Sequence, residues 1–265
     1  MAELELTDRC LLHYRVDGSA EAGCPLLLFN GASLPLEFWG GVVDRLAPER
    51  RVVRFDARNA GKTRAHGAFT LLDVARDAVN LVDALGIERV VAVGHAWGGR
   101  VAQVFARDYP HRVAALVVCG TGGQFPPKVT ADEIAAMRRA FTERRRDAWE
   151  AALESTYCAP GFRTRDPLVF GEITELLWHA PAHPRPQWDP RPAPSESYWG
   201  MARAPTLLVY GQHDRNGTPE NARDLAARIP GARLVTIEDA GHFVVREAEV
   251  RVAAEIGAFL SDISA

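Results

Sequence analysis

The sequence predicts an α/β protein in which helices cover a mostly parallel β-sheet. Short apolar runs alternate with segments of helical periodicity along most of the 265 residues, which is typical of this class. The central runs are apolar at nearly every position, as strands buried on both faces are. A chain of this length can form one such domain and bury a large core without disulfides.

Seven apolar runs predict strands, and capping signals support the helices between them. The strands are expected at residues 11–16, 26–30, 52–56, 90–94, 113–119, 206–211 and 234–237. The helices are expected at residues 71–85, 100–109, 219–229 and 247–260. Thr70 and Asp73 form a capping box before the first helix, Gly86 follows that helix, and Pro219 opens the third.

The alternation breaks in one long segment between the strands at 113–119 and 206–211. Thr130 and Glu133 form a second capping box, which predicts a helix that continues through Trp149. An Asp-Pro pair begins a further predicted helix, which runs through Trp178.

Six prolines follow at 181–194, too many for a helix or a central strand. We therefore expect residues 1–124 and 204–265 to form the core, and residues 125–203 to form a helical lid with an extended return.

Composition excludes several classes of protein. A net charge of -3 argues against binding to nucleic acid or to an anionic membrane. No apolar run is long enough for a transmembrane helix, and the acidic first residues do not resemble a signal peptide. The four cysteines form no CxxC pair and no metal-ligand spacing. We expect reduced thiols, a cytoplasmic location, and neither a metal nor another cofactor.

The motif with the clearest chemical meaning is VVAVGHAWGG at residues 90–99, an apolar strand that enters a glycine-rich turn and a helix. A G-x-S-x-G pattern at such a junction is a nucleophile elbow, whose tight turn projects the central side chain above the sheet. The turn also directs the next N–H, here that of Trp97, at a developing oxyanion. The central residue is Ala96, which has no oxygen, so this chain cannot form an acyl-enzyme there.

Three further features occur where an elbow of this kind requires them. Asp214 follows a late strand and His242 follows the final one, which gives the order nucleophile, acid, histidine. The carboxylate would fix the tautomer of the imidazole, which would take a proton from a nucleophile or from water. Asn30, Gly31 and Ala32 end an early strand, and the N–H of Ala32 is the expected second oxyanion donor.

From end to end the chain resembles the α/β-hydrolase superfamily, and in particular the group that includes 3-oxoadipate enol-lactonases. NGASL at 30–34, followed by Phe38 and Trp39, is similar to that group's N-S-L-G-T…M-W run. RFDARNAGKT at 54–63 is similar to its R-Y-D-x-R-G-x-G-x-S loop. LVDALGIER at 81–89 and APTLL at 204–208 are general features of the superfamily. The resemblance implies an eight-stranded, mostly parallel sheet and an inserted helical lid.

The resemblance also implies roles for individual residues. Ala96 takes the position of the serine nucleophile, Asp214 that of the acid and His242 that of the base. Ala32 and Trp97 take the oxyanion-hole positions. The implied activity is hydrolysis of a small ester or lactone through an acyl-enzyme. Two residues depart from the pattern, since Asn59 replaces a glycine and Ala96 replaces the nucleophile.

Several explanations of Ala96 remain open. The residue could be an inactivating replacement of serine, which the intact Asp214 and His242 favour. The protein could instead lack the nucleophile naturally and act as a binding or receptor protein, or as a lyase or isomerase that uses His242. Aspartate is a third possible ancestor, because GHDWGG is the elbow of epoxide hydrolases and dehalogenases. The residues at 30–33 do not fit the H-G-x-P motif of those enzymes.

The remaining candidates concern the walls of the site. Asn30, Gly31 and Trp178 are expected to contact the substrate. Trp178 is included because aromatic surface in the lid suits an apolar pocket. His95 is expected to pack in the core, and Asp239 to serve a turn rather than to act as the acid.

Overall fold

The computed structural model describes residues 2–6, 10–18, 23–58, 60–65, 67–179 and 197–264. Within these residues, eight strands form one sheet in the order β1-β2-β4-β3-β5-β6-β7-β8. The strands are β1 (Ala2–Leu6), β2 (Cys10–Asp17), β3 (Leu26–Phe29), β4 (Val52–Phe55), β5 (Val90–His95), β6 (Val113–Cys119), β7 (Thr206–Gly211) and β8 (Arg233–Ile237). The pairs β1–β2 and β2–β4 are antiparallel, and the pairs from β4 to β8 are parallel. The predicted eight-stranded, mostly parallel sheet is confirmed.

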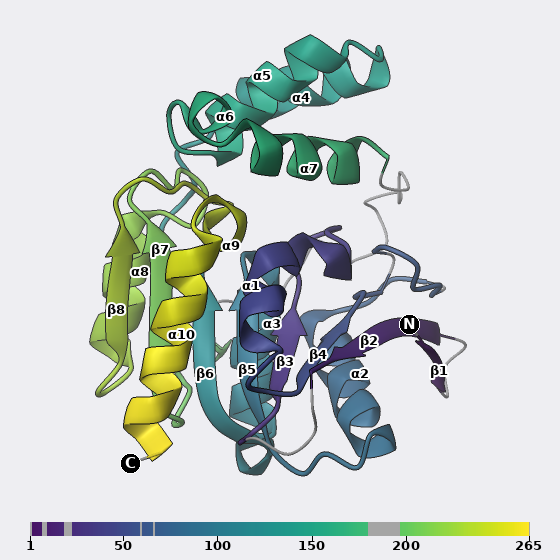
Figure 1. Ribbon diagram of the computed structural model, residues 1–265, viewed down its shortest axis with the longest axis vertical. Helices are drawn as coiled ribbons and strands as arrows, with labels where there is room; N and C mark the ends of the chain where they lie inside the picture. Colours follow the sequence, from purple (N-terminus) through teal and green to yellow (C-terminus); the bar gives the residue numbers. More distant parts are fainter. Residues whose placement is uncertain are drawn as a thin grey trace.

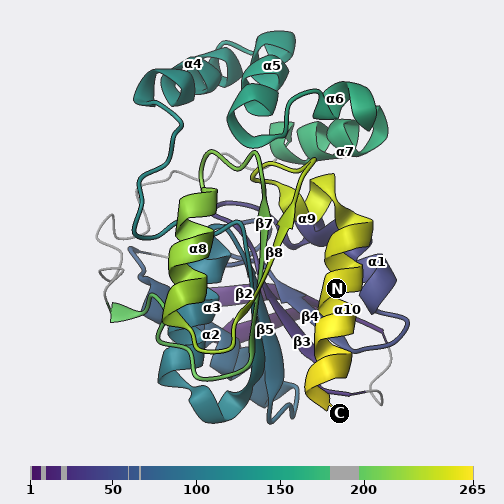
Figure 2. The ribbon, with the colours of Figure 1, turned by 90° about the vertical axis from the view of Figure 1, so that its left-hand side faces the viewer.

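Helices cover both faces of the sheet, as Figure 2 shows. One face carries α2 (Leu71–Ala84), α3 (Trp97–Asp108) and α8 (Pro219–Arg228), and the other carries α1 (Gly40–Leu46) and α10 (Glu249–Ser264). Strand β3 shows how the sheet divides the core, because alternate side chains point to opposite faces. Leu27 and Phe29 pack in the first core, whereas Leu26 and Leu28 pack in the second.

Strand β1 is the strand that the apolar runs do not predict. Glu3 and Glu5 are exposed at the edge of the sheet, while Leu4 and Leu6 turn inward. An edge strand of alternating acidic and apolar residues has too little apolar character to stand out as a run.

Short helical elements complete the core of the molecule. They are η1 (Leu36–Trp39) after β3, η2 (Pro110–Arg112) before β6 and α9 (Val244–Glu247) before α10. The capping box of Thr70 and Asp73 at the start of α2 is present as predicted. Helix α3 begins at Trp97, directly after the elbow and three residues earlier than expected.

Among the described residues between β6 and β7 are four insertion helices: α4 (Ala131–Thr142), α5 (Arg146–Tyr157), α6 (Phe162–Arg165) and α7 (Pro167–Trp178). Figure 1 shows them grouped at one end of the molecule. They adjoin the edge where the parallel strands end. A hydrogen bond shows this contact: the N–H of His242, which follows β8, donates to the carbonyl of Tyr157 in α5 at 2.7 Å.

The prediction of one helix from Thr130 through Trp149 is wrong. Helix α4 ends at Thr142, and the chain reverses through Arg144, whose φ is 58°. The reversal lets the apolar faces of α4 and α5 meet, with the rings of Phe141 and Trp149 5.9 Å apart. Both capping signals are correct, since Thr130 caps α4 and Asp166 caps α7. The proline-rich run at 181–194 lies outside the described residues, as does Asn59.

Candidate active site

The turn between β5 and α3 consists of Ala96 alone, in a strained conformation. Its φ of 52° and ψ of -118° lie in a region that residues other than glycine rarely adopt. Holding alanine in this conformation costs about 1–3 kcal/mol of conformational energy. Surrounding hydrogen bonds impose this conformation. The N–H of Ala96 donates to the carbonyl of Cys119 at 2.9 Å, and its carbonyl accepts from Oγ1 of Thr121 at 3.0 Å. The strain fits a turn shaped to present position 96 and the N–H that follows it.

Two glycines of the motif are required by close backbone contacts. A Cβ atom on Gly94 would lie 2.5 Å from the carbonyl oxygen of Gly98, and one on Gly98 would lie 2.1 Å from that of Phe29. Neither contact can relax by moving a flexible side chain, because both partners are backbone atoms. The spacing of the G-x-A-x-G motif therefore follows from the close packing of the first turn of α3 against both Gly94 on β5 and the end of β3.

His242 and Asp214 form a buried hydrogen-bonded pair. Nδ1 of His242 lies 3.0 and 3.1 Å from the two carboxylate oxygens of Asp214. The N–H groups of Asn216 and Gly217 donate to Oδ1 of Asp214 at 2.8 and 2.7 Å, which fixes the carboxylate in one orientation. With Nδ1–H donated to Asp214, Nε2 of His242 is the nitrogen left to act as a base.

Hydrogen bonds also fix the backbone N–H and carbonyl of His242. Besides the bond of its N–H to Tyr157, the carbonyl of His242 accepts a hydrogen bond from Nε2 of His95 at 2.8 Å. Burial lowers the pKa of His95 to about 3, so that imidazole is neutral. His95 packs against Phe38, as expected, and in addition it supports the loop that carries His242.

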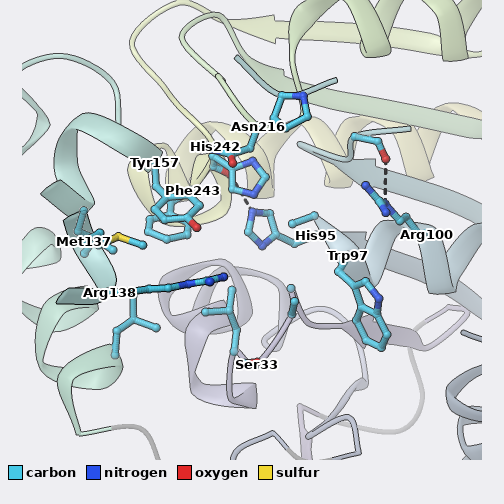
Figure 3. A pocket seen from close by; sticks show the side chains of 18 of the residues that line it. Ser33, His95, Trp97, Arg100, Met137, Arg138, Tyr157, Asn216, His242 and Phe243 are labelled. Carbon is cyan, nitrogen blue, oxygen red and sulfur yellow. Dashed lines mark hydrogen bonds between the residues drawn. The ribbon is translucent and has the colours of Figure 1, made fainter. Parts of the chain in front are cut away.

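A cavity of about 710 Å³ brings most of the predicted site together. Ala96 and His242 line it, and so do the residues at the two expected oxyanion positions, Ala32 and Trp97. Figure 3 shows His242 and Trp97 among the lining side chains. Trp97 is the first residue of α3, and the N-terminal end of a helix favours negative charge. Side chains of the insertion helices form apolar walls, among them Met137, Phe141, Trp149 and Leu153.

Asn30 does not line this cavity. Its amide nitrogen donates to the carbonyls of Leu34 and Phe55, and its oxygen accepts from Nε1 of Trp39 at 2.7 Å. Asn30 therefore holds the turn that contains Gly31 and Ala32, both of which do line the cavity. Sequence patterns could not separate these roles, because an asparagine at the end of a strand can point to either side of the loop.

We expect Asn30→Ala to lower the free energy of unfolding by about 2–4 kcal/mol, because it leaves a buried indole N–H and two carbonyls without this partner. Chemical denaturation measures the change. The control is Asn80→Ala on α2, which removes an amide that makes no such bonds among the described residues and should shift stability by less than about 0.5 kcal/mol. Equal losses in the two variants would contradict this role for Asn30.

Trp178 also lies outside the cavity lining, contrary to its expected contact with substrate. Its ring packs against Phe141 at 5.1 Å and Trp149 at 5.0 Å, between ring centroids. The guanidinium groups of Arg144 and Arg146 lie over the indole at 5.6 and 5.9 Å. Trp178 therefore supports the apolar wall from behind, and Phe141 and Trp149 present the aromatic surface.

Glu247 is a residue near the site that sequence analysis did not identify. Its Oε2 accepts from the N–H of Ala159, which follows α5, at 2.7 Å and from that of Gly241 at 3.0 Å. The carboxyl thus joins the insertion to the loop that carries His242. Burial raises the pKa of Glu247 from its ordinary 4.5 to about 7. An isolated Glu in a helical segment gives no sequence signal for this link.

We expect this buried carboxyl to make stability fall as pH rises. Between 4.5 and about 7 the unfolded chain has lost the proton that the folded chain keeps, so unfolding releases a proton. The free energy of unfolding falls by about 3 kcal/mol in total, and the fall is complete once the pH exceeds the pKa of Glu247 in the folded chain. Glu247→Gln should remove this slope, whereas Glu238→Gln, at an exposed position, should retain it. Thermal unfolding across this pH range tests the difference, and identical profiles for Glu247→Gln and the parent would contradict it.

A family model described as alpha/beta hydrolase fold matches residues 25–248. The chain belongs to the α/β-hydrolase family. A curated relative of this α/β-hydrolase, 2-hydroxymuconate semialdehyde hydrolase of Pseudomonas sp. (strain CF600), is 29% identical over 263 residues, which cover 92% of this chain and 89% of the relative.

Solved structures similar to this α/β-hydrolase include two named enzymes. A thermophilic esterase from Thermogutta terrifontis matches with a TM-score of 0.80 and 28% identity, covering 99% of this chain and 98% of its own. The enol-lactonase from Burkholderia xenovorans LB400 matches with a TM-score of 0.79 and 25% identity, covering 98% of this chain and 100% of its own. The relatives named here are therefore hydrolases of several substrate types.

Two searches of the described residues concern other kinds of site. No group of three or more His, Cys, Asp or Glu side chains in that part of the α/β-hydrolase is placed to hold a metal ion. Among the helices described, none is long and apolar enough to cross a membrane.

Proposed function

We propose that this protein is a serine-type hydrolase of a small ester or lactone, and that Ala96 is an inactivating replacement of the serine nucleophile. The observation that carries the proposal is the strained turn at Ala96, which shares one cavity with a His242 that Asp214 orients. A turn without a chemical role would avoid this strain by using glycine at that position.

With serine at position 96, the reaction follows from the positions of these groups. Nε2 of His242 accepts the hydroxyl proton as the serine oxygen bonds to the carbonyl carbon of the substrate. The N–H groups of Ala32 and Trp97 stabilise the negative oxygen of the tetrahedral intermediate. The C–O bond to the leaving group then breaks, and His242 gives its proton to the departing oxygen.

Water completes the cycle by the same steps. His242 takes a proton from the water as its oxygen bonds to the acyl carbon, and the serine oxygen leaves with that proton. The products are a carboxylic acid and the alcohol, or one hydroxy acid if the substrate is a lactone. Asp214 keeps the imidazole in one tautomer throughout and stabilises its charged form.

The substrate class rests on the walls of the cavity and on the relatives. The apolar walls suit a small organic acyl or alkyl group, and the named relatives include an esterase and an enol-lactonase. We propose that residues 125–203 act as a lid that supplies this wall, while residues 1–124 and 204–265 form the catalytic core.

The absence of cysteine pairing motifs supports a cytoplasmic location.

A second candidate follows from Ala96 itself. If alanine is the natural residue, His242 and Asp214 could still move a proton on a substrate held in the same cavity, as a lyase or an isomerase would. Such an enzyme would be active with Ala96 and would lose its activity in His242→Ala. A binding protein would retain its ligand in that variant.

Labelling with a fluorophosphonate probe tests the proposed nucleophile. The reagent bonds to an activated serine oxygen and expels fluoride, and it does not react with alanine. We expect no label on the present chain and one label per molecule on Ala96→Ser, with loss of that label when His242→Ala is added. Labelling of the present chain at another serine would show that the nucleophile lies elsewhere.

A further inference from the structure

The cavity is unbalanced in charge. Arg100 and Arg138 line it, and none of the described lining residues is Asp or Glu. Asp214 does not line the cavity, and its carboxylate is hydrogen-bonded to His242 and to two backbone N–H groups. A ligand in the cavity therefore meets positive charge without a neighbouring carboxylate to neutralise it.

Arg138 is the arginine of the described insertion helices that lines the cavity, and it lacks the ion pairs that several neighbouring arginines make. Arg146 pairs with Glu150 at 2.8 Å, Arg163 with the same carboxylate at 3.0 Å, and Arg215 with Glu133 at 2.9 Å. Within the described part of the chain, no carboxylate lies within ion-pair distance of Arg138. Figure 3 shows its side chain extending from α4 into the cavity, toward the side on which Ser33 and His95 lie.

Arg100 is not placed to bind the same ligand group as Arg138. Its Nε donates to the carbonyl of Gly122 at 3.0 Å, and Figure 3 shows it on the opposite side of the cavity from Arg138. A ligand group at Arg138 therefore meets one guanidinium rather than a converging pair. A single planar guanidinium matches the two oxygens of one carboxylate, which it can bind through two parallel N–H···O bonds.

We propose that Arg138 binds a carboxylate carried by the substrate. This assignment rests on the proposed function, which places the scissile ester or lactone carbonyl at Ala96. Met137 and Phe141 on α4, with Leu153 on α5, supply apolar surface for the carbon chain between the two polar ends. The substrate class is therefore a half-ester or a lactone that bears a free carboxylic acid.

The size of the expected effect depends on solvent. Arg138 is an exposed residue, so water screens part of the attraction. A charge-assisted pair that the ligand partly covers should be worth roughly a tenfold change in affinity. Added salt should reduce this preference, because it screens exposed charges.

Binding to the present chain tests the proposal without any catalysis. The probes are monomethyl glutarate, which carries one carboxylate, and dimethyl glutarate, its neutral counterpart, and calorimetric titration at low salt measures both affinities. We expect the monoanion to bind roughly tenfold more tightly. Arg138→Gln should remove the preference. Arg139→Gln, which removes an equal charge from an exposed neighbour that does not line the cavity, should retain it.

A kinetic arm separates this proposal from the proposed function. In Ala96→Ser, kcat/KM for mono-p-nitrophenyl glutarate should exceed that for p-nitrophenyl pentanoate, and Arg138→Gln should lower only the former, roughly tenfold. If Ala96→Ser is inert, the proposed hydrolysis fails while the binding preference still supports Arg138. Equal affinity of the two glutarate probes for the present chain, or no binding of the monoanion, would overturn the assignment.

Discussion

Replacing Ala96 with serine is expected to raise the rate of ester hydrolysis by about 10⁴–10⁶, the scale of the loss when a triad nucleophile is removed. One oxygen would complete the site, because the strained turn, the His242–Asp214 pair and the two N–H positions already line or support one cavity. The assay compares the present chain with Ala96→Ser on p-nitrophenyl acetate and a panel of small lactones.

Two variants separate this gain from nonspecific effects. Adding His242→Ala to Ala96→Ser should return the rate to that of the present chain, because the hydroxyl then lacks its base. Ala96→Asp should produce no dehalogenase activity, since residues 30–33 do not carry the motif of those enzymes. If Ala96→Ser stays as inert as the present chain on every substrate, the serine mechanism should be abandoned in favour of a non-hydrolytic role for His242.

Asp214→Asn in the Ala96→Ser background is expected to lower kcat by about 10⁴, the loss seen when the acid of a serine triad becomes an amide. The direction of the amide can be worked out from the structure. Because Asn216 and Gly217 both donate to Oδ1, the amide oxygen should take that place and the NH₂ group should take the place of Oδ2. Nδ1 of His242, 3.1 Å from that atom, would then have to accept a hydrogen bond, which puts the proton on Nε2.

Asp239→Asn provides the matched control for this experiment. Asp239 is an exposed acid three residues before His242, and its conversion to an amide should leave kcat within about twofold. Rates at several pH values should show no recovery of Asp214→Asn below neutrality, because a protonated imidazole cannot act as a base. Equal effects of the two substitutions would mean that Asp214 is not the orienting acid.

Buried strands and capped helices were predictable because their signals are local. The runs that became β3 to β8 are apolar over consecutive residues, and Thr70 and Thr130 cap their helices through partners three residues away. Strand β1 was missed because its glutamates interrupt the apolar pattern. The break between α4 and α5 was missed because it depends on the packing of Phe141 against Trp149, which is a tertiary contact.

The same distinction between local signals and tertiary contacts applies to the candidate site. Ala96, Asp214 and His242 were identified because each lies within five residues of the end of a predicted strand, and parallel strands end at one edge of a sheet. The walls depend on the packing of the insertion, which no strand-end pattern describes. For this reason Trp178 was expected in the cavity and lies behind it, while Arg138 and Glu247 had no sequence signal.

Trapping of the acyl-enzyme on Ala96→Ser tests the central claim most directly. The variant is mixed with p-nitrophenyl acetate, quenched in acid before deacylation is complete, and digested for peptide mass spectrometry. The account predicts one acetyl group per molecule, on the introduced serine in the peptide that contains His95 and Trp97, and none on the present chain. An acetyl group on any other residue, or turnover of the ester without an adduct at position 96, would contradict it.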